Sequence, residues 1–500
     1  MLRWVKPDEE ISPDRLERGL RSLVIEGAFS QVTLVLTTGA FLIGLALALG
    51  ASNTVIGILS AVGPIAQVIQ IPATYLVERL RWRRFLSVSA AWLSRLALLG
   101  MATLPFPPWP ASWRIPMLLV FLGLHYGLGA VSWCAFNSWI RDLVPMERLS
   151  SFFARRLTVA TLIGALVSFG GGAAVDAMND QFQLGAGSYA ALFVVAGVVG
   201  LIGLTVLSRV PEPRMPQAPA EPIRALLMQP IRDTRFRAVL VFMAWWSFAV
   251  NFVAPFFAVY LLQELGLSMT FVLALSVLSQ ITNVAFFGLW GRLADRFTNK
   301  SVLLLAVPMF FLTLLLWPFT TMPEPHLLTL PLLIVIHVVS GIALAGVALC
   351  AGNLALKSAP YGRAASYLAV NALVSGIAAA IAPIIAGITA DRLAPFELRL
   401  DLVFARWVEA APVLQLPTID IRGMDFLFVF AFIFGLYCMH RLLAVREEGE
   451  VTEEVLREAF FEETRRMVRQ VSTVAGVRQV LIFPAGELGP HPSREDVTRM

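Results

Sequence analysis

The sequence predicts an all-α membrane protein whose twelve transmembrane helices form two parallel repeats of six. Composition is the first reason, because 57% of the 500 residues are hydrophobic and only 15% are charged. A soluble protein needs roughly a quarter of its residues charged to cover its surface. The apolar residues also gather in blocks of about 20, the length of helix that crosses about 30 Å of hydrocarbon. Short patterns then recur at a nearly constant spacing along the chain.

Apolar blocks bounded by charged, proline-rich or glycine-rich turns define the helices in order. They span residues 28–49, 54–77, 86–104, 116–140, 157–176, 188–208, 238–262, 270–293, 301–320, 328–356, 366–390 and 424–444. We therefore expect helical bundles at 24–208 and 238–445, a linker at 209–237, and terminal segments at 1–23 and 446–500. The first block is too long for the core of a signal peptide, so we expect it to be retained.

Basic residues in the short loops predict the orientation, since Lys and Arg concentrate on the cytoplasmic side during insertion. The loop at 79–84 carries four arginines, whereas the short loops of the opposite side carry only Arg114. We therefore place both termini and the linker in the cytoplasm, the segment 391–425 outside, and the protein in the inner (plasma) membrane. The net charge of +5 follows from this pattern, and we expect no nucleic-acid partner.

The chain repeats itself at offsets of 215 to 217 residues. The recurring residues are Pro145, Arg148, Ser151 and Phe152 with Pro360, Arg363, Ser366 and Tyr367; Gly172 and Asp176 with Gly387 and Asp391; Gly50 and Ser52 with Gly266 and Ser268; and Glu78-Arg79 with Asp295-Arg296. A near-constant offset across four separate segments indicates a duplicated six-helix unit. Because six is an even number, the two copies share one orientation.

The loop between the eighth and ninth helices carries a family resemblance. It reads Gly291-Arg292-Leu293-Ala294-Asp295-Arg296-Phe297-Thr298-Asn299-Lys300. Together with parallel six-helix halves, it resembles the signature loop of the major facilitator superfamily, although Thr298 stands where a second glycine is expected. The first-half counterpart keeps Glu78-Arg79 and loses both glycines. The resemblance covers about residues 24–445, and the run from Asn137 to Arg156 is similar to a bacterial group without assigned substrates.

The resemblance implies that the signature loops act as gates. Asp295 could cap the facing N-terminus of helix 11, or pair with an arginine of a neighbouring loop, only when the cytoplasmic side is closed. The alternative is that Asp295 and Arg296 are ordinary interfacial charges. The gating residues that we predict are Glu78, Arg79, Arg148, Gly291, Asp295, Arg296 and Arg363.

In transporters of this kind helices 1, 4, 7 and 10 line a central path, and polar side chains inside spans tend to face such a path. His125 and His337 lie in equivalent helices and could exchange a proton near neutral pH. The predicted substrate-binding residues are Gln31, His125, Tyr126, Trp246, Asn251, Gln280, Asn283, His337 and Asn371. Hydrogen bonds between neighbouring helices explain any one of these polar residues equally well.

Two charged residues and the tail have no assigned role. Arg95 lies about three turns inside the third helix, and the sequence offers no acid to pair with it. Glu26 is either a proton carrier or an interfacial charge. After Arg446 an apolar stripe either docks on the cytoplasmic loops or on a partner, or belongs to an amphipathic extension. The stripe consists of Leu456, Phe460, Met467 and Val471.

These features predict a secondary active or facilitative transporter that moves a small molecule by alternating access. No phosphate-cradling glycine loop followed by Lys is present, so we expect neither an ATP-driven pump nor an enzyme. The three cysteines lack metal-ligand spacing, and we expect no cofactor. The expected partners are a small-molecule substrate and the lipid bilayer, with or without a coupling proton or other ion, and the protein is expected to be a monomer. The alternative is a transporter-like scaffold, assembly factor or sensor that has lost transport.

Overall fold

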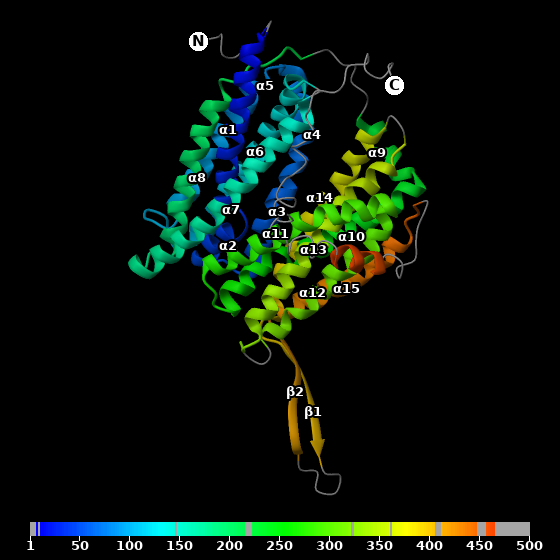
Figure 1. Ribbon diagram of the computed structural model, residues 1–500. Coiled ribbons are helices and arrows are strands. Elements are labelled where there is room, and N and C mark those ends of the chain that lie inside the picture. Colours follow the sequence, from blue (N-terminus) through cyan, green and yellow to red (C-terminus); the bar gives the residue numbers. More distant parts are fainter. Residues whose placement is uncertain are drawn as a thin grey trace.

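A computed structural model describes residues 7–8, 11–145, 148–215, 223–321, 325–360, 363–405, 412–447 and 457–465. In that part of the chain, twelve helices are long and apolar enough to cross a membrane, which confirms the predicted fold class. Helix α1 begins at one end of the bundle, and a long β-hairpin leaves the opposite end (Figure 1). We call these two ends the terminal side and the hairpin side.

The N half contains six spans. They are α1 (Pro13–Thr37) with α2 (Gly39–Ala48), α3 (Asn53–Ala66) with α4 (Gln70–Leu80), α5 (Arg83–Thr103), α6 (Ala111–Leu143), α7 (Leu149–Phe182) and α8 (Ala186–Leu207). The first span was predicted as one helix, but Thr38 is extended and Gly39 has a φ of +56°, a conformation that glycine adopts at little cost. The span is therefore broken inside the membrane.

The C half repeats this arrangement after a short linker helix. Its elements are α9 (Ile223–Arg232), α10 (Thr234–Val259), α11 (Met269–Arg296), α12 (Asn299–Leu316), α13 (Thr329–Lys357), α14 (Ala364–Leu393) and α15 (Asp425–Leu443). The predicted linker is thus partly helical, and α1 starts well before the predicted bundle. Hydropathy does not register these extensions because their outer turns are polar.

The repeated pairs Gly50–Ser52 and Gly266–Ser268 shape equivalent turns. Both glycines have a positive φ, of 85° and 60°. Each serine then caps the following helix, since Ser52 Oγ accepts the N–H of Val55 and Ser268 Oγ accepts that of Phe271. The sequence repeat therefore reflects a repeated helix start.

A two-stranded antiparallel hairpin joins α14 to α15 and was not foreseen by the all-α prediction. Strand β1 (Glu397–Ala405) pairs with β2 (Pro412–Arg422), and the hairpin projects away from the bundle (Figure 1). In the register, Leu398 lies opposite Ile421 and Arg399 opposite Asp420. This alternation of apolar and charged pairs has the period of a strand, which a scan for 20-residue apolar blocks does not detect.

Each half packs around its own apolar core. Leu45, Leu98 and Phe193 are buried in the N half, and Trp290 and Phe311 in the C half. Across the boundary, α3 packs against α14 and α7 against α11. Counted as membrane spans, the second span (α3) therefore contacts the eleventh (α14), and the fifth span (α7) contacts the eighth (α11).

Candidate functional site

Two aspartates join the halves at the hairpin side. The carboxylate of Asp391 on α14 accepts the backbone N–H groups of Asn53 and Thr54 at 3.0 and 2.8 Å, where α3 begins. The carboxylate of Asp176 on α7 accepts those of Met269 and Thr270 at 3.0 and 2.7 Å, where α11 begins. The first N–H groups of a helix lack partners within the helix and attract negative charge. Each half therefore caps a helix of the other half, and we call these contacts the aspartate latches.

Glycines allow the helices to approach closely beside both latches. A Cβ on Gly57 would overlap the carbonyl oxygen of Pro383, and one on Gly387 would overlap that of Asn53. At the second latch, a Cβ on Gly172 would lie 2.8 Å from Cδ1 of Leu273. The helices of the two halves are thus in backbone contact at this side.

The aspartate latches explain a repeat to which the sequence analysis gave no role. Gly172 and Asp176 lie on one side of the boundary in α7, and Gly387 and Asp391 occupy the same positions in α14. We had predicted gates only at the opposite side. The signal was the shared offset of a glycine and an acid at the end of an apolar block.

The predicted gating residues of the signature loops lie exposed at the terminal side. Glu78 and Arg79 end α4, and Asp295 and Arg296 end α11. Within the described part of the chain, none of these four side chains bonds to the other half. Asp295 lies in α11, which packs against α7, the fifth span. The helix of the other half that Asp295 could reach is therefore α7, and we had expected the eleventh span, which is α14 and belongs to the same half as Asp295. Their gating role stays a prediction.

The other predicted gating residues contact their own half. Arg148, at the start of α7, forms an ion pair with Glu17 of α1. Arg363, at the start of α14, donates to the side-chain oxygen of Gln229 in α9. Gly291 lies in α11 near Leu349. Arg148 thus connects α7 to α1, the first helix of the N half, and Arg363 connects α14 to α9, the first helix of the C half.

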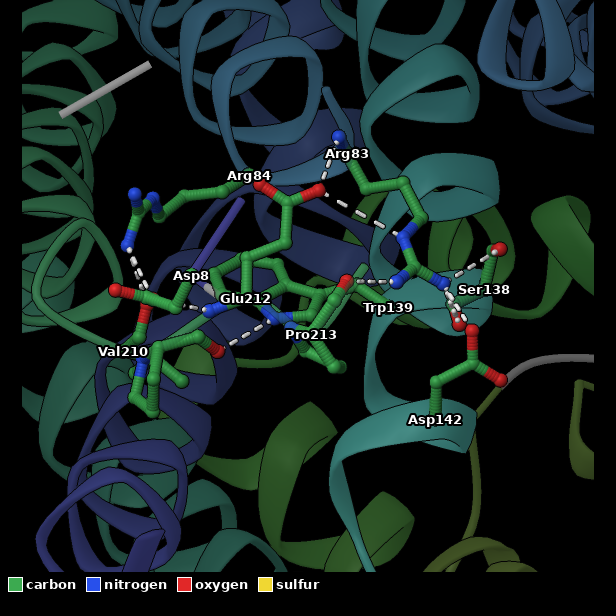
Figure 2. Close-up of polar contacts among 10 residues, drawn as sticks. Asp8, Arg83, Arg84, Ser138, Trp139, Asp142, Val210, Glu212 and Pro213 are labelled. Atoms are coloured by element: carbon green, nitrogen blue, oxygen red, sulfur yellow. Dashed lines mark hydrogen bonds and ion pairs between the residues drawn. The ribbon is translucent and has the colours of Figure 1, made fainter. Parts of the chain in front are cut away.

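A buried ionic anchor fixes the start of the linker to the N half (Figure 2). Arg83, the first residue of α5, is fully buried, as is Glu212. The N–H of Arg83 donates to Glu212 Oε1 at 2.6 Å, and its Nη2 donates to the carbonyl of Pro213 at 2.6 Å. Arg83 also pairs with Asp142 of α6. Burial raises the pKa of the Glu212 carboxyl, while the N–H groups and charges of Arg83 and Arg84 act in the opposite direction.

An equivalent anchor holds the chain that follows the C half. Glu447 accepts the N–H of Lys300 at 2.7 Å and the side-chain amide of Asn299 at 2.9 Å, where α12 begins. Lys300 follows Arg83 at the repeat offset of 217 residues. Neither anchor was predicted from the sequence, although each acid follows the last helix of its half by four or five residues.

The tail contacts the second signature loop. The ring of Phe460 stacks on Trp290 with centroids 4.8 Å apart, and Glu463 lies 3.8 Å from Arg292. This supports docking on the loops of the terminal side, one of the two interpretations of the apolar stripe. Leu456, Met467 and Val471 lie outside the described residues.

The two histidines find their hydrogen-bond partners in separate halves, and their position on one shared cavity stays a prediction. His125 of α6 is buried, with its Nδ1 2.8 Å from the hydroxyl and 3.1 Å from the carbonyl of Ser94 in α5. His337 of α13 bonds through Nδ1 to the carbonyl of Leu333 at 2.8 Å, beside the ring of Trp317. A buried polar group requires a partner, and each ring finds one within its own half.

Several other predicted binding residues also make contacts inside one half. Trp246 packs against Phe310 and Phe311 of α12, and Asn283 donates to the carbonyl of Gly341 in α13 at 3.4 Å. Two further amides donate to carbonyls of their own helices, Asn251 to Ser247 and Gln280 to Ser276. For Trp246 and Asn283 the structure supports the alternative of contacts between helices.

Gln31, Tyr126 and Asn371 stay candidates for the path. Gln31 of α1 packs against α7, where a Cβ on Gly164 would lie 2.9 Å from its Nε2. Tyr126 is half-buried beside Gly63 of α3. Asn371 Oδ1 is buried and has no hydrogen-bond partner among the described residues.

The charged residues that lacked a partner in sequence meet in the N half. Glu26 is buried and lies 2.9 Å from Nη2 of Arg156, in α7. Arg95 of α5 interacts electrostatically with the same carboxylate. Glu26 thus has an ion-pair partner in α7, whereas Arg95 forms no ion pair among the described residues.

Comparison with known proteins places these contacts in context. A family model described as Major Facilitator Superfamily matches residues 27–383. No curated protein matches the chain in sequence. Among solved structures, a mutant of the nucleoside transporter NupG superposes with a TM-score of 0.67 at 12% identity, over 86% of this chain and 100% of that one.

Two further structures have the same architecture. A D-xylose-proton symporter superposes with a TM-score of 0.60 at 17% identity, over 88% of this chain and 100% of that one. A bacterial homolog of the human lysosomal transporter Spinster, in an inward-facing and unoccupied conformation, gives 0.59 at 16% identity, over 87% and 98%. At such identities the likeness shows a shared fold.

Proposed function

This chain belongs to the Major Facilitator Superfamily and is a membrane transporter rather than an enzyme, and we propose that it moves a small molecule by alternating access. Its transport is secondary active or facilitative. The rival reading, a scaffold, assembly factor or sensor that has lost transport, gains no support from the family or the fold.

One observation carries this proposal. Both aspartate latches join the halves at the hairpin side, whereas Glu78, Arg79, Asp295 and Arg296 of the signature loops make no bond across the boundary among the described residues. Halves held together at one side and separate at the other are what a rocking transporter needs in one of its two states. Opening the latches while the signature loops approach one another would produce the second state.

We assign the terminal side to the cytoplasm, which makes the described state inward-open. The arginine-rich loops, α9 and the start of α1 all lie at that side. Positive loops are retained in the cytoplasm during insertion. A reporter fused after Arg214 should therefore report cytoplasm, and one fused near Val413 should report the outside of the inner membrane. An external signal after Arg214 would reverse the assignment.

Chemical labelling of an introduced cysteine tests the aspartate latches. A cysteine replaces Ala380, which is buried about three turns of α14 below Asp391, in a background without the three native cysteines. Asp176→Asn and Asp391→Asn keep one side-chain oxygen as an acceptor and remove the negative charge at the helix start, which is worth about 0.3–1 kcal/mol. Labelling by an impermeant maleimide from the hairpin side should then rise roughly two- to fivefold.

Asp180→Asn is the matched control, because Asp180 is exposed one turn beyond Asp176 on α7. It should leave labelling at the level of the parent protein. If both latch variants label no faster than this control, the aspartate latches do not govern access and the alternating-access proposal loses its main support.

A further inference from the structure

Glu26, Arg95 and Arg156 form an ionic cluster inside the N half. Glu26 is only 4% exposed, and its Oε2 lies 2.9 Å from Arg156 Nη2 while its Oε1 accepts the hydroxyl of Ser30. Arg156 Nε also donates to the carbonyl of Leu23 at 3.2 Å. Arg156 is thus held against α1 by two contacts, one of which is to a carboxylate.

Arg95 lacks such contacts. It interacts electrostatically with Glu26, yet its Nε is buried without a hydrogen bond, and it forms no hydrogen bond or ion pair with the described residues. An arginine has five N–H donors and does not deprotonate in proteins. A half-buried arginine whose Nε has no hydrogen-bond partner is therefore available as a second partner for the carboxylate of Glu26.

Glycines make room for both arginines. A Cβ on Gly27 of α1 would lie 2.7 Å from Arg156 Nε, and one on Gly200 of α8 would lie 2.8 Å from Arg95 Nε. Any other residue at either position would displace a guanidinium. Each arginine side chain therefore packs directly against a glycine of a neighbouring helix.

The cluster has an excess positive charge. Two arginines face a single carboxylate, and an unbalanced charge inside a membrane protein is costly unless a counter-charge reaches it. In the described C half, every Asp, Glu, Lys or Arg lies near an end of its helix, so no such residue there balances the cluster at its depth. A mobile anion would supply the missing charge.

Arg156 is more exposed than the carboxylate with which it pairs. Its side chain is 17% exposed against 6% for that of Glu26, and its guanidinium lies 5.2 Å from the ring centroid of Phe136 in α6. Arg156 therefore lies among α1, α6 and α7, which are the first, fourth and fifth spans. Helices 1 and 4 line the path in the transporters that the sequence resembles, so a solute could reach its remaining donors.

The break in the first span independently favours an anion. Helix α2 starts inside the membrane at Gly39, where a Cβ would meet nothing within 4 Å. The hydroxyl of Thr38 donates to the carbonyl of Leu34 instead of capping α2. The first N–H groups of α2 are left without a side-chain cap beside open space, and a helix start of this kind attracts negative charge.

We propose that the transported solute is an organic anion with a carboxylate or phosphate group that binds Arg156. Glu26 occupies Arg156 when the solute is absent and moves to Arg95 when the solute displaces it. This inference rests on the proposed transport function and adds the charge of the substrate and an exchange of partners by Glu26.

Thermal unfolding of the purified full-length protein tests the proposal. The probes are acetate, benzoate, inorganic phosphate and phenyl phosphate, with acetamide and benzamide as neutral counterparts. At least one anion should raise the unfolding temperature, and the neutral probes should not. Glu26→Gln removes the internal competitor, so it should tighten binding of that anion on the order of tenfold.

Two further variants separate binding from folding. Glu26→Gln with Arg156→Gln removes the ion pair as a unit, so it should fold and lose the response to anions. Arg155→Gln changes an exposed neighbour outside the cluster and should respond as the parent protein does. If no anion stabilises either the parent or Glu26→Gln, if neutral probes act equally well, or if Glu26→Gln weakens binding, the anion assignment is wrong. The latch labelling does not depend on solute charge, so failure here would leave alternating access intact.

Discussion

In the N half the start of α5 is held by Glu212, and in the C half the start of α12 is held by Glu447. The aspartate latches repeat in the same way, with Asp176 and Asp391 at equivalent positions. These shared contacts hold each half together or connect one half to the other. Residues that recur at the repeat offset of 215 to 217 therefore mark contacts that hold the two halves in place.

The interiors of the two halves differ. The N half contains the ionic cluster of Glu26, Arg95 and Arg156, whereas the equivalent depth of the C half is filled by aromatic rings. The ring of Trp245, for example, contacts those of Phe248, Phe434 and Tyr437. The contacts between the halves are thus alike in the two repeats, whereas the charged and aromatic residues inside the halves differ.

The largest expected difference between the halves concerns their anchors. Arg83→Gln leaves the carboxylate of Glu212 buried without its guanidinium, which should cost about 3–5 kcal/mol of folding stability. Lys300→Gln should cost about 1 kcal/mol, because it removes the bond from Lys300 Nζ to the carbonyl of Leu443 but keeps the backbone N–H that binds Glu447. Thermal unfolding of the two variants measures this difference.

A double variant checks the cause. Arg83→Gln with Glu212→Gln removes both charges and should recover much of the stability that Arg83→Gln loses. Equal destabilisation by Arg83→Gln and Lys300→Gln would mean that the two anchors contribute equally to folding stability and would contradict this expectation.

A smaller difference is expected where the halves touch. Gly57→Ala and Gly387→Ala would force a methyl group into backbone oxygens of the opposite half, at a cost of about 1–3 kcal/mol to the contact between α3 and α14. Gly172→Ala should cost less, because its nearest neighbour is the end of the Leu273 side chain, which can move. Labelling of the cysteine at position 380 from the hairpin side should increase in that order, and a greater effect of Gly172→Ala would contradict it.

The smallest effect is expected from the hairpin, which the N half lacks. In the N half α7 and α8 are joined by residues 183–185 alone, and Leu398 and Leu400 of the hairpin are about half exposed. Replacing residues 398–421 by a short Gly/Ser linker should change folding stability by less than about 0.5 kcal/mol. The N–H of Arg422 stays available to Asp425 in this variant. A large drop in unfolding temperature would show that the hairpin supports the bundle.

The sequence alone determined the number of spans, their division into parallel halves and the family. These properties depend on the length and hydropathy of segments, because a chain in lipid must satisfy its backbone within helices. The repeat at 215 residues also contained the aspartate latches, although their partners were not visible in it.

Only the tertiary structure decided which polar side chains meet. His125, His337 and Trp246 lie between helices of their own half, and Glu26 of α1 pairs with Arg156 of α7. The physical reason is rotation, since a polar residue inside a span can face the path or a neighbouring helix depending on how the helix is turned about its axis. That rotation results from the packing of all the helices together, and hydropathy along one of them does not record it.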